Sequence, residues 1–119
     1  MQLQHFDARV RLQTGIAVID LRGEINGLAE EALDRAYIEA TDGDPRRILL
    51  NFTGATYINS TGLALLVGVL ARARKQHRTV VACGLSDHYR EIFEITRLAD
   101  FMSIVADEMS ATMAPLPGP

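Results

Sequence analysis

Residues 46–76, RRILLNFTGATYINSTGLALLVGVLARARKQ, contain the pattern that decides the fold. The first seven, RRILLNF, form a short apolar run that is typical of a buried central strand and suggests parallel pairing. Residues 53–58 are expected to form a loop. From residue 60 to about residue 76 the chain is rich in Leu, Ala and Val, which predicts a helix. A buried strand that leads through a loop into a helix is the repeating unit of an α/β domain.

Two strands and a helix are predicted before this unit. Residues 2–25 have a strand-like pattern with a turn near residues 13–15, and the β-branched residues of IAVIDLRGEI support a hairpin. Residues 28–41 change to a period of three and four, with apolar residues on one face and charged residues on the other. They predict an amphipathic helix, which ends at the breaker DGDP.

Strands and helices alternate to the end of the chain. The next buried strand, RTVVACG, is followed by a third helix that begins at Ser86 and Asp87 and runs to about residue 96. A short turn, a short strand at residues 101–105 and a helical turn or two at residues 107–113 complete the pattern. The order β-β-α-β-α-β-α-β-α predicts an α/β fold, with a mixed, largely parallel sheet of four to five strands and about four helices.

Composition limits the class of protein. With 119 residues and 48% hydrophobic composition, the chain suffices for a single domain, expected at residues 1–114, before a flexible proline-rich tail at residues 115–119. The net charge of −3 gives no electrostatic footprint for direct nucleic-acid binding. The single cysteine, Cys83, cannot form an internal disulfide, and no segment resembles a signal peptide or a membrane span. We expect a cytoplasmic protein that does not contact membranes.

The segment YINSTGL, residues 57–63, places two hydroxyls where a loop meets the start of a helix. Free backbone N–H groups and the positive end of the helix dipole favour an anion there. The segment lacks the lysine of a phosphate-binding P-loop and the GxSxG pattern of a nucleophile elbow. It is a candidate for a modifiable hydroxyl, and the simpler alternative is that Ser60 or Asn59 only caps the helix.

Three motifs resemble the STAS domains of bacterial anti-sigma factor antagonists. LRGEIN at residues 21–26 is similar to the family's GE[LI]D, and residues 48–52 followed by YINSTGL are similar to its DS[ST]GL. CGLSDHYREIFEITRL, residues 83–98, is similar to its third helix and the turn after it. The motifs match in order and spacing, and the resemblance covers nearly the whole chain. It implies a STAS-like fold for the single domain.

The resemblance also implies a regulatory role. In the family, the serine after the aspartate is phosphorylated by a partner anti-sigma factor that is a serine kinase, and a metal-dependent phosphatase of the PP2C type removes the phosphate. Ser60 has that place here, with Thr61 as the lesser candidate. The unmodified form binds the anti-sigma factor and thereby releases a sigma factor, which regulates transcription indirectly. Because a phosphoserine adds about −1.5 to −2 charge, it can switch binding with little refolding.

Two departures from the family pattern leave an alternative open. Asn26 and Asn59 stand where the family has aspartates. The loss of two carboxylates reduces the repulsion of a phosphoryl group, but it also removes groups that could orient the serine hydroxyl or complement basic residues of the kinase. The alternative is a non-switching STAS scaffold or a regulatory subunit of a signalling assembly.

The second helix and the loops beside it supply the expected partner surface. Helical spacing assigns the face with Val67 to the core and leaves Leu65 and Val69 on an adjoining, exposed face. Gly68 in mid-helix costs about 1 kcal/mol relative to alanine, so a partner or a neighbouring strand is expected to come close to it. Leu65 and Val69 are therefore predicted partner contacts. The resemblance implies that the loop after the second strand and the start of this helix also belong to the partner surface, which adds Glu24, Asn26, Tyr57, Asn59, Thr61 and Gly62.

Other candidate sites are weaker. The basic residues at positions 72–78 cluster at the end of the second helix, where cations offset the dipole, and no aromatic residues interleave them. A receiver-like domain is disfavoured because two strands precede the first helix, and an enzyme because no recognisable orienting acid accompanies Ser60 and His88. The three histidines lie far apart and do not suggest a zinc site. We therefore expect no catalysis, no cofactor, no metal, and a monomer or weak dimer.

Overall fold

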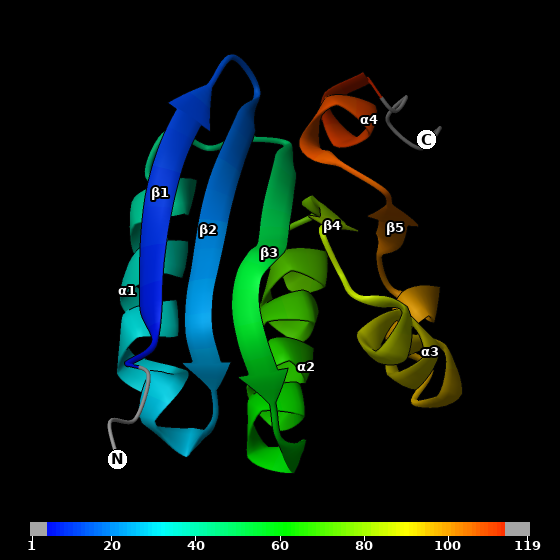
Figure 1. Ribbon diagram of the computed structural model, residues 1–119. Helices are drawn as coiled ribbons and strands as arrows, with labels where there is room; N and C mark the ends of the chain where they lie inside the picture. Colours follow the sequence, from blue (N-terminus) through cyan, green and yellow to red (C-terminus); the bar gives the residue numbers. More distant parts are fainter. Residues whose placement is uncertain (1–4, 114–119) are drawn as a thin grey trace.

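The computed structural model describes residues 5–113, which form one five-stranded sheet and its helices (Figure 1). No helix in this range has the length and hydropathy that crossing a membrane requires. The expected tail at residues 115–119 lies outside the described residues. In chain order the elements are β1 (Asp7–Gln13), β2 (Ile16–Ile25), the 3-10 helix η1 (Gly27–Ala29), α1 (Glu30–Thr41), β3 (Arg47–Ile58), α2 (Ser60–Lys75), β4 (Thr79–Cys83), α3 (Asp87–Ile95), the 3-10 helix η2 (Leu98–Asp100), β5 (Ser103–Val105) and α4 (Glu108–Met113).

The sheet is mixed, as the sequence predicted. Its strands lie in the order β1-β2-β3-β4-β5, with β1 antiparallel to β2 and every later pair parallel. Helices α1, α2 and α3 each connect two neighbouring parallel strands. Because the three connections have the same handedness and each leads to the next strand in the same direction along the sheet, their helices lie on the same face. Figure 1 shows α1 and α2 behind β1, β2 and β3. The predicted fold class and order of elements are confirmed.

Two apolar clusters hold the helices to the sheet. In the larger cluster, Ile19 of β2 packs with residues of α1, α2 and α3, and the rings of Phe52 and Phe93 meet edge to face at 5.7 Å. The next residue back in β2, Val18, belongs to a smaller cluster that includes Ala111 of α4. Because successive side chains of a strand point to opposite faces, α4 covers part of the face that the other helices leave open.

Strand β3 is longer than the sequence predicted. Residues 53–58, which were expected to be a loop, continue the strand to Ile58 and pair with β2, with Gly54 opposite Arg22 and Tyr57 opposite Glu24. The register shifts in this part of the pair, and the regular alternation of buried and exposed residues is lost, so the strand has no clear sequence pattern. The extension carries the end of β3 alongside the end of β2.

Helix α2 forms where it was predicted, but its buried face is rotated from the predicted one. Val67, assigned to the core, is 49% exposed, and Val69, assigned to the partner surface, is only 9% exposed. The buried residues follow a stripe from Gly62 through Leu66 and Val69 to Ala73, at intervals of three and four residues. Val67 and Val69 therefore exchange roles, and Val69 is a core residue.

The surroundings of Gly68 contradict one of its two expected explanations. The residue is exposed, and a Cβ atom added to it would have no heavy atom within 4 Å. No strand within residues 5–113 therefore approaches it closely. The cost of about 1 kcal/mol for glycine in mid-helix is not recovered by packing inside the described domain.

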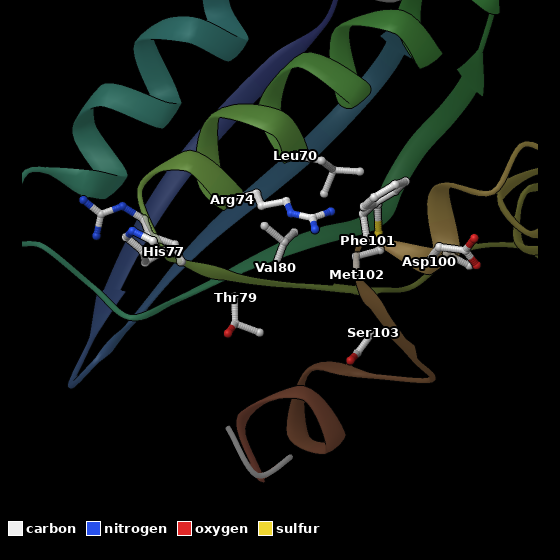
Figure 2. A pocket seen from close by; sticks show the side chains of 11 residues that line it. Leu70, Arg74, His77, Thr79, Val80, Asp100, Phe101, Met102 and Ser103 are labelled. Atoms are coloured by element: carbon white, nitrogen blue, oxygen red, sulfur yellow. The ribbon is translucent and has the colours of Figure 1, made fainter. Parts of the chain in front are cut away.

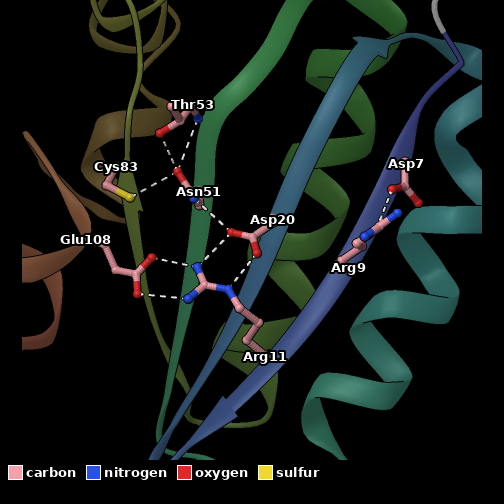
Figure 3. Close-up of polar contacts among 8 residues, drawn as sticks. All are labelled: Asp7, Arg9, Arg11, Asp20, Asn51, Thr53, Cys83 and Glu108. Carbon is pink, nitrogen blue, oxygen red and sulfur yellow. Dashed lines mark hydrogen bonds and ion pairs between the residues drawn. The ribbon is translucent and has the colours of Figure 1, made fainter.

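An ion-pair network fastens α4 over the second face of the sheet (Figure 3). Arg11 of β1 donates to the two carboxylate oxygens of Asp20 at 2.6 and 2.9 Å and to the two of Glu108 at 3.0 and 2.6 Å. At the other end of α4, the buried Arg47 donates to the Ala111 carbonyl at 2.9 Å. Side chains from β1, β2 and β3 thus hold the last helix, although it is far from them in sequence.

The same contacts change the acidity of the groups around them. The hydrogen bonds from Arg11, and secondarily from Asn51, hold the pKa of Asp20 below its usual value against the opposing effect of burial. Arg11 lowers the pKa of Glu108 in the same way. Burial raises the pKa of the Cys83 thiol to about 11, so the thiol stays protonated beneath α4 at neutral pH.

We predict that Asp20 makes the domain acid-sensitive. Because its folded-state pKa is depressed, its contribution to stability is complete above the unfolded-state pKa of about 3.9 and is lost as pH falls through the folded-state value. Urea unfolding at pH 7, 4 and 3 is expected to show a steeper loss of stability below about pH 4 for the wild type than for Asp20→Asn. Parallel losses in the two proteins would contradict this assignment.

Candidate functional site at the start of helix α2

The ends of β2 and β3 lie side by side, and a helix begins directly after each. Ile25 and Ile58 are paired in parallel register, and the Asn59 N–H donates to the Ile25 carbonyl at 3.2 Å. Gly62, in the first turn of α2, lies so close to that carbonyl that a Cβ atom would overlap it. The start of α2 is therefore fixed against the end of β2.

Two asparagines cap the two helices. Asn26 Oδ1 accepts the Leu28 N–H at 2.9 Å and caps η1, and Asn59 Oδ1 accepts the Gly62 N–H at 2.8 Å and caps α2. Both backbones are extended at the cap, as the N-cap position requires. An amide oxygen and a carboxylate oxygen can accept this hydrogen bond with the same geometry. Asparagine therefore caps the helix as an aspartate would, but without the negative charge.

Ser60 is the first residue of α2 and is exposed. Of the two N-cap alternatives, Asn59 provides the cap, and the Ser60 hydroxyl has no hydrogen-bond partner within residues 5–113. Thr61 is also exposed. The positive end of the dipole of a 16-residue helix lies at these two hydroxyls, which favours negative charge there.

The predicted partner-binding residues divide into an exposed group and a buried group. Tyr57 near the end of β3 is 52% exposed, and Thr61 in the first turn of α2 is also exposed. Gly62 and Val69 are buried, so neither presents a side chain to a partner, and their role is packing. The remaining predicted residues are partly buried: Glu24, Asn26, Asn59 and Leu65.

Sequence reasoning missed two residues at this site. Leu28 of η1 is 85% exposed, and its neighbour Gly27 lies next to the Thr61 side chain, so Leu28 places an apolar side chain beside the start of α2. The only signal in the sequence is an apolar residue directly after the Asn-Gly turn. Tyr89 of α3 is the second: its hydroxyl accepts the Ile58 N–H at 2.9 Å, which ties α3 to the end of β3.

The basic residues at the other end of α2 form a separate groove of about 590 Å³ (Figure 2). Arg74 lies there with its guanidinium 5.4 Å from the centre of the Phe101 ring. Arg78 is bound within the chain, because it donates to Asp44 at 2.9 Å and to the Pro45 carbonyl at 2.6 Å. These contacts favour a helix end stabilised by its own neighbours over a nucleic-acid site. Within residues 5–113, no group of three His, Cys, Asp or Glu side chains could hold a metal ion.

The structure thus defines a small α/β domain with an exposed hydroxyl at a helix start and exposed apolar side chains near it. The comparison with protein families is more specific, because the STAS domain matches residues 7–112. This chain belongs to the STAS domain family, as its three motifs predicted.

Known proteins of similar sequence and structure agree with this assignment. BtrV of Bordetella bronchiseptica, which carries the provisional designation of an anti-sigma factor antagonist, is 32% identical over 102 residues, or 84% of this chain and 85% of BtrV. An anti-sigma factor antagonist from Mycobacterium paratuberculosis superposes with a TM-score of 0.73 at 20% identity, over 91% of this chain and 92% of that one. The Bacillus cell fate determinant SpoIIAA in its phosphorylated form gives 0.65 at 23% identity, over 91% and 97%. The two structures establish the fold.

We predict that the Asn59 cap contributes to stability through its side-chain oxygen. Asn59→Ala leaves the Gly62 N–H without its acceptor and is expected to lower the free energy of unfolding by about 1 kcal/mol. Asn59→Asp keeps the acceptor and is the matched control, expected to be close to the wild type. Urea unfolding at neutral pH measures both, and an Asn59→Ala variant as stable as the wild type would argue against the cap.

We also predict opposite effects for alanine at two glycines of α2. Gly62→Ala places a Cβ atom against the Ile25 carbonyl and is expected to lower the free energy of unfolding by about 1–3 kcal/mol. Gly68→Ala has open space around it and is expected to raise that free energy by about 0.5–1 kcal/mol. Thermal and urea unfolding compare the two variants, and a stable Gly62→Ala protein would contradict the close packing of α2 on β2.

Proposed function

We propose that this protein is an anti-sigma factor antagonist that binds a serine-kinase anti-sigma factor when it is unphosphorylated and is released by phosphorylation at Ser60. The designation of BtrV supports the class, and its match extends over most of both chains. SpoIIAA has been solved in unphosphorylated and phosphorylated forms, and its similar fold supports a phosphorylation switch. By controlling an anti-sigma factor, the protein would regulate transcription without touching DNA.

The observation that carries the proposal is the exposed hydroxyl of Ser60 at the first position of α2, which has no hydrogen-bond partner among residues 5–113. A kinase can reach it, and the helix dipole tolerates a phosphate there. The exposed side chains of Leu28 and Tyr57 lie on the two segments that meet at this helix start and supply apolar contact area. A phosphate placed in such an interface opposes binding, because a charged group would have to lose its water.

The proposal includes partners and setting. A PP2C-type phosphatase restores the unmodified form, the protein acts in the cytoplasm as a monomer or weak dimer, and it has no catalysis of its own. The single domain is proposed to span residues 1–114. The second candidate, a non-switching scaffold or regulatory subunit, is favoured by Asn26 and Asn59, since both cap positions lack the carboxylate of the family pattern.

Intact mass and peptide mapping after incubation with ATP, magnesium and each serine-kinase anti-sigma factor of the source organism test the switch. We expect a single added phosphate on Ser60 in the wild type and in Thr61→Ala, and none in Ser60→Ala. The phosphorylated protein is expected to bind the kinase at least about tenfold more weakly than the unmodified protein, because the phosphate must be desolvated in the interface.

The alternatives give different results in the same experiment. If the protein binds an anti-sigma factor tightly but no kinase phosphorylates it, the non-switching scaffold is the correct function and the phosphorylation switch is wrong. If the phosphate is found on Thr61 alone, the phosphorylation site is Thr61 and not Ser60. Absence of binding to every anti-sigma factor would overturn the antagonist function itself.

A further inference from the structure

Gly68 is an unexplained feature of α2. It lies in the middle of a 16-residue helix, it is exposed, and nothing within 4 Å would touch a side chain at its position. Glycine destabilises a helix interior relative to alanine, because it loses more backbone freedom on folding. Gly62, on the same helix, is required by the Ile25 carbonyl, whereas the described domain contains no such requirement for Gly68.

Gly68 lies in a groove of about 290 Å³ between α1 and α2. Leu65, which is half-buried, contributes its accessible apolar surface, and the buried Leu33 and Val69 also line it. Ala64 and Gly68 keep it open because their side chains are small or absent. Glu30 and Asp34 of α1 and Arg72 of α2 complete its lining. The two charged residues of α1 in this lining, Glu30 and Asp34, are acidic and exposed.

The groove continues the surface around Ser60. Leu65 lies one helical turn after Thr61, so the two side chains share one side of α2. Glu30 begins α1 directly after η1, the short helix that carries the exposed Leu28. A partner that covers Ser60 and Leu28 therefore lies near the end of the groove at Glu30 and Leu65.

The unbalanced charge in the groove is negative. Glu30 is exposed and has no ion-pair partner within residues 5–113. Asp34 and Arg72 neutralise each other at 3.3 Å, and the Arg72 guanidinium also lies 4.5 Å from the centre of the Tyr37 ring. A basic side chain is the group that complements Glu30.

We propose that the groove between α1 and α2 receives a helix of the anti-sigma factor, with its closest backbone approach at Gly68 and a basic side chain at Glu30. This inference rests on the proposed function and adds a second contact region to the one at Ser60. The separation of two packed helices depends on the side chains between them, so a methyl group at position 68 holds the partner helix away. The destabilisation of the free domain by glycine at position 68 is then offset by the closer contact that it allows in the complex.

The test uses the fact that stability and binding should change in opposite directions. The probe is the purified serine-kinase anti-sigma factor used in the Ser60 experiment, and affinity is measured by calorimetry with the full chain. Gly68→Ala is expected to raise the urea midpoint and yet weaken binding about tenfold, with Gly68→Leu weaker still. Ala71→Leu, exposed on the same helix but outside the groove, is the control for added bulk and is expected to bind like the wild type.

A charge pair of variants tests the acidic side of the groove. Glu30→Lys is expected to weaken binding about tenfold or more and to reduce its dependence on salt. Glu39→Lys, exposed at the other end of α1, makes the same charge change and is expected to leave affinity within about twofold of the wild type.

The results separate this inference from the proposed function. If the wild type binds the kinase and both Gly68 variants and Glu30→Lys bind equally well, the groove is not part of the interface, and the antagonist function stands. If the wild type binds no anti-sigma factor, both proposals are overturned. If Gly68→Ala loses stability along with affinity, the glycine has a structural role and the groove assignment is wrong.

Discussion

The parallel register that brings β2 and β3 to a common end is the constraint on which the functional surface depends. The Asn59 N–H is hydrogen-bonded to the Ile25 carbonyl, and Gly62 packs against the same carbonyl. Ser60 stands between these two contacts, so its backbone is fixed while its hydroxyl stays exposed. A group held on a rigid turn presents one geometry to any binding partner, with little entropy to lose on association.

The two faces of the sheet are secured by different forces. Burial of apolar side chains dominates on the face that α1, α2 and α3 cover, whereas α4 is held on the other face by Ala111 and by arginines that reach its two ends. A half-exposed ion pair such as that of Arg11 contributes modestly, because solvent screens it. The last helix therefore depends on fewer apolar contacts than the helices of the other face, and it lies away from the start of α2.

Much of this fold could be predicted from the sequence, and the errors have physical causes. Apolar runs and helical periods gave the element order, and the NSTG segment indicated the helix start at Ser60. Residues 53–58 were assigned to a loop because a register shift removes the alternation by which a strand is identified. Val67 was predicted to be buried and Val69 to be exposed, the reverse of the structure, because an apolar helix has few polar residues to mark its exposed face. Leu28 was missed because exposure of a single apolar residue depends on tertiary packing, which periodicity does not encode.

The two asparagine caps separate functions that an aspartate would combine. A carboxylate at an N-cap accepts a backbone N–H and also adds a negative charge, which favours the helix dipole but opposes a phosphate on the next residue. Asn59 keeps the hydrogen bond at 2.8 Å without the charge. The cap of α2 therefore adds no negative charge that would repel a phosphate on the neighbouring residue. Under the proposed function, the electrostatic effect of a phosphate at Ser60 would come from the phosphate itself and from the groups of the partner that face it.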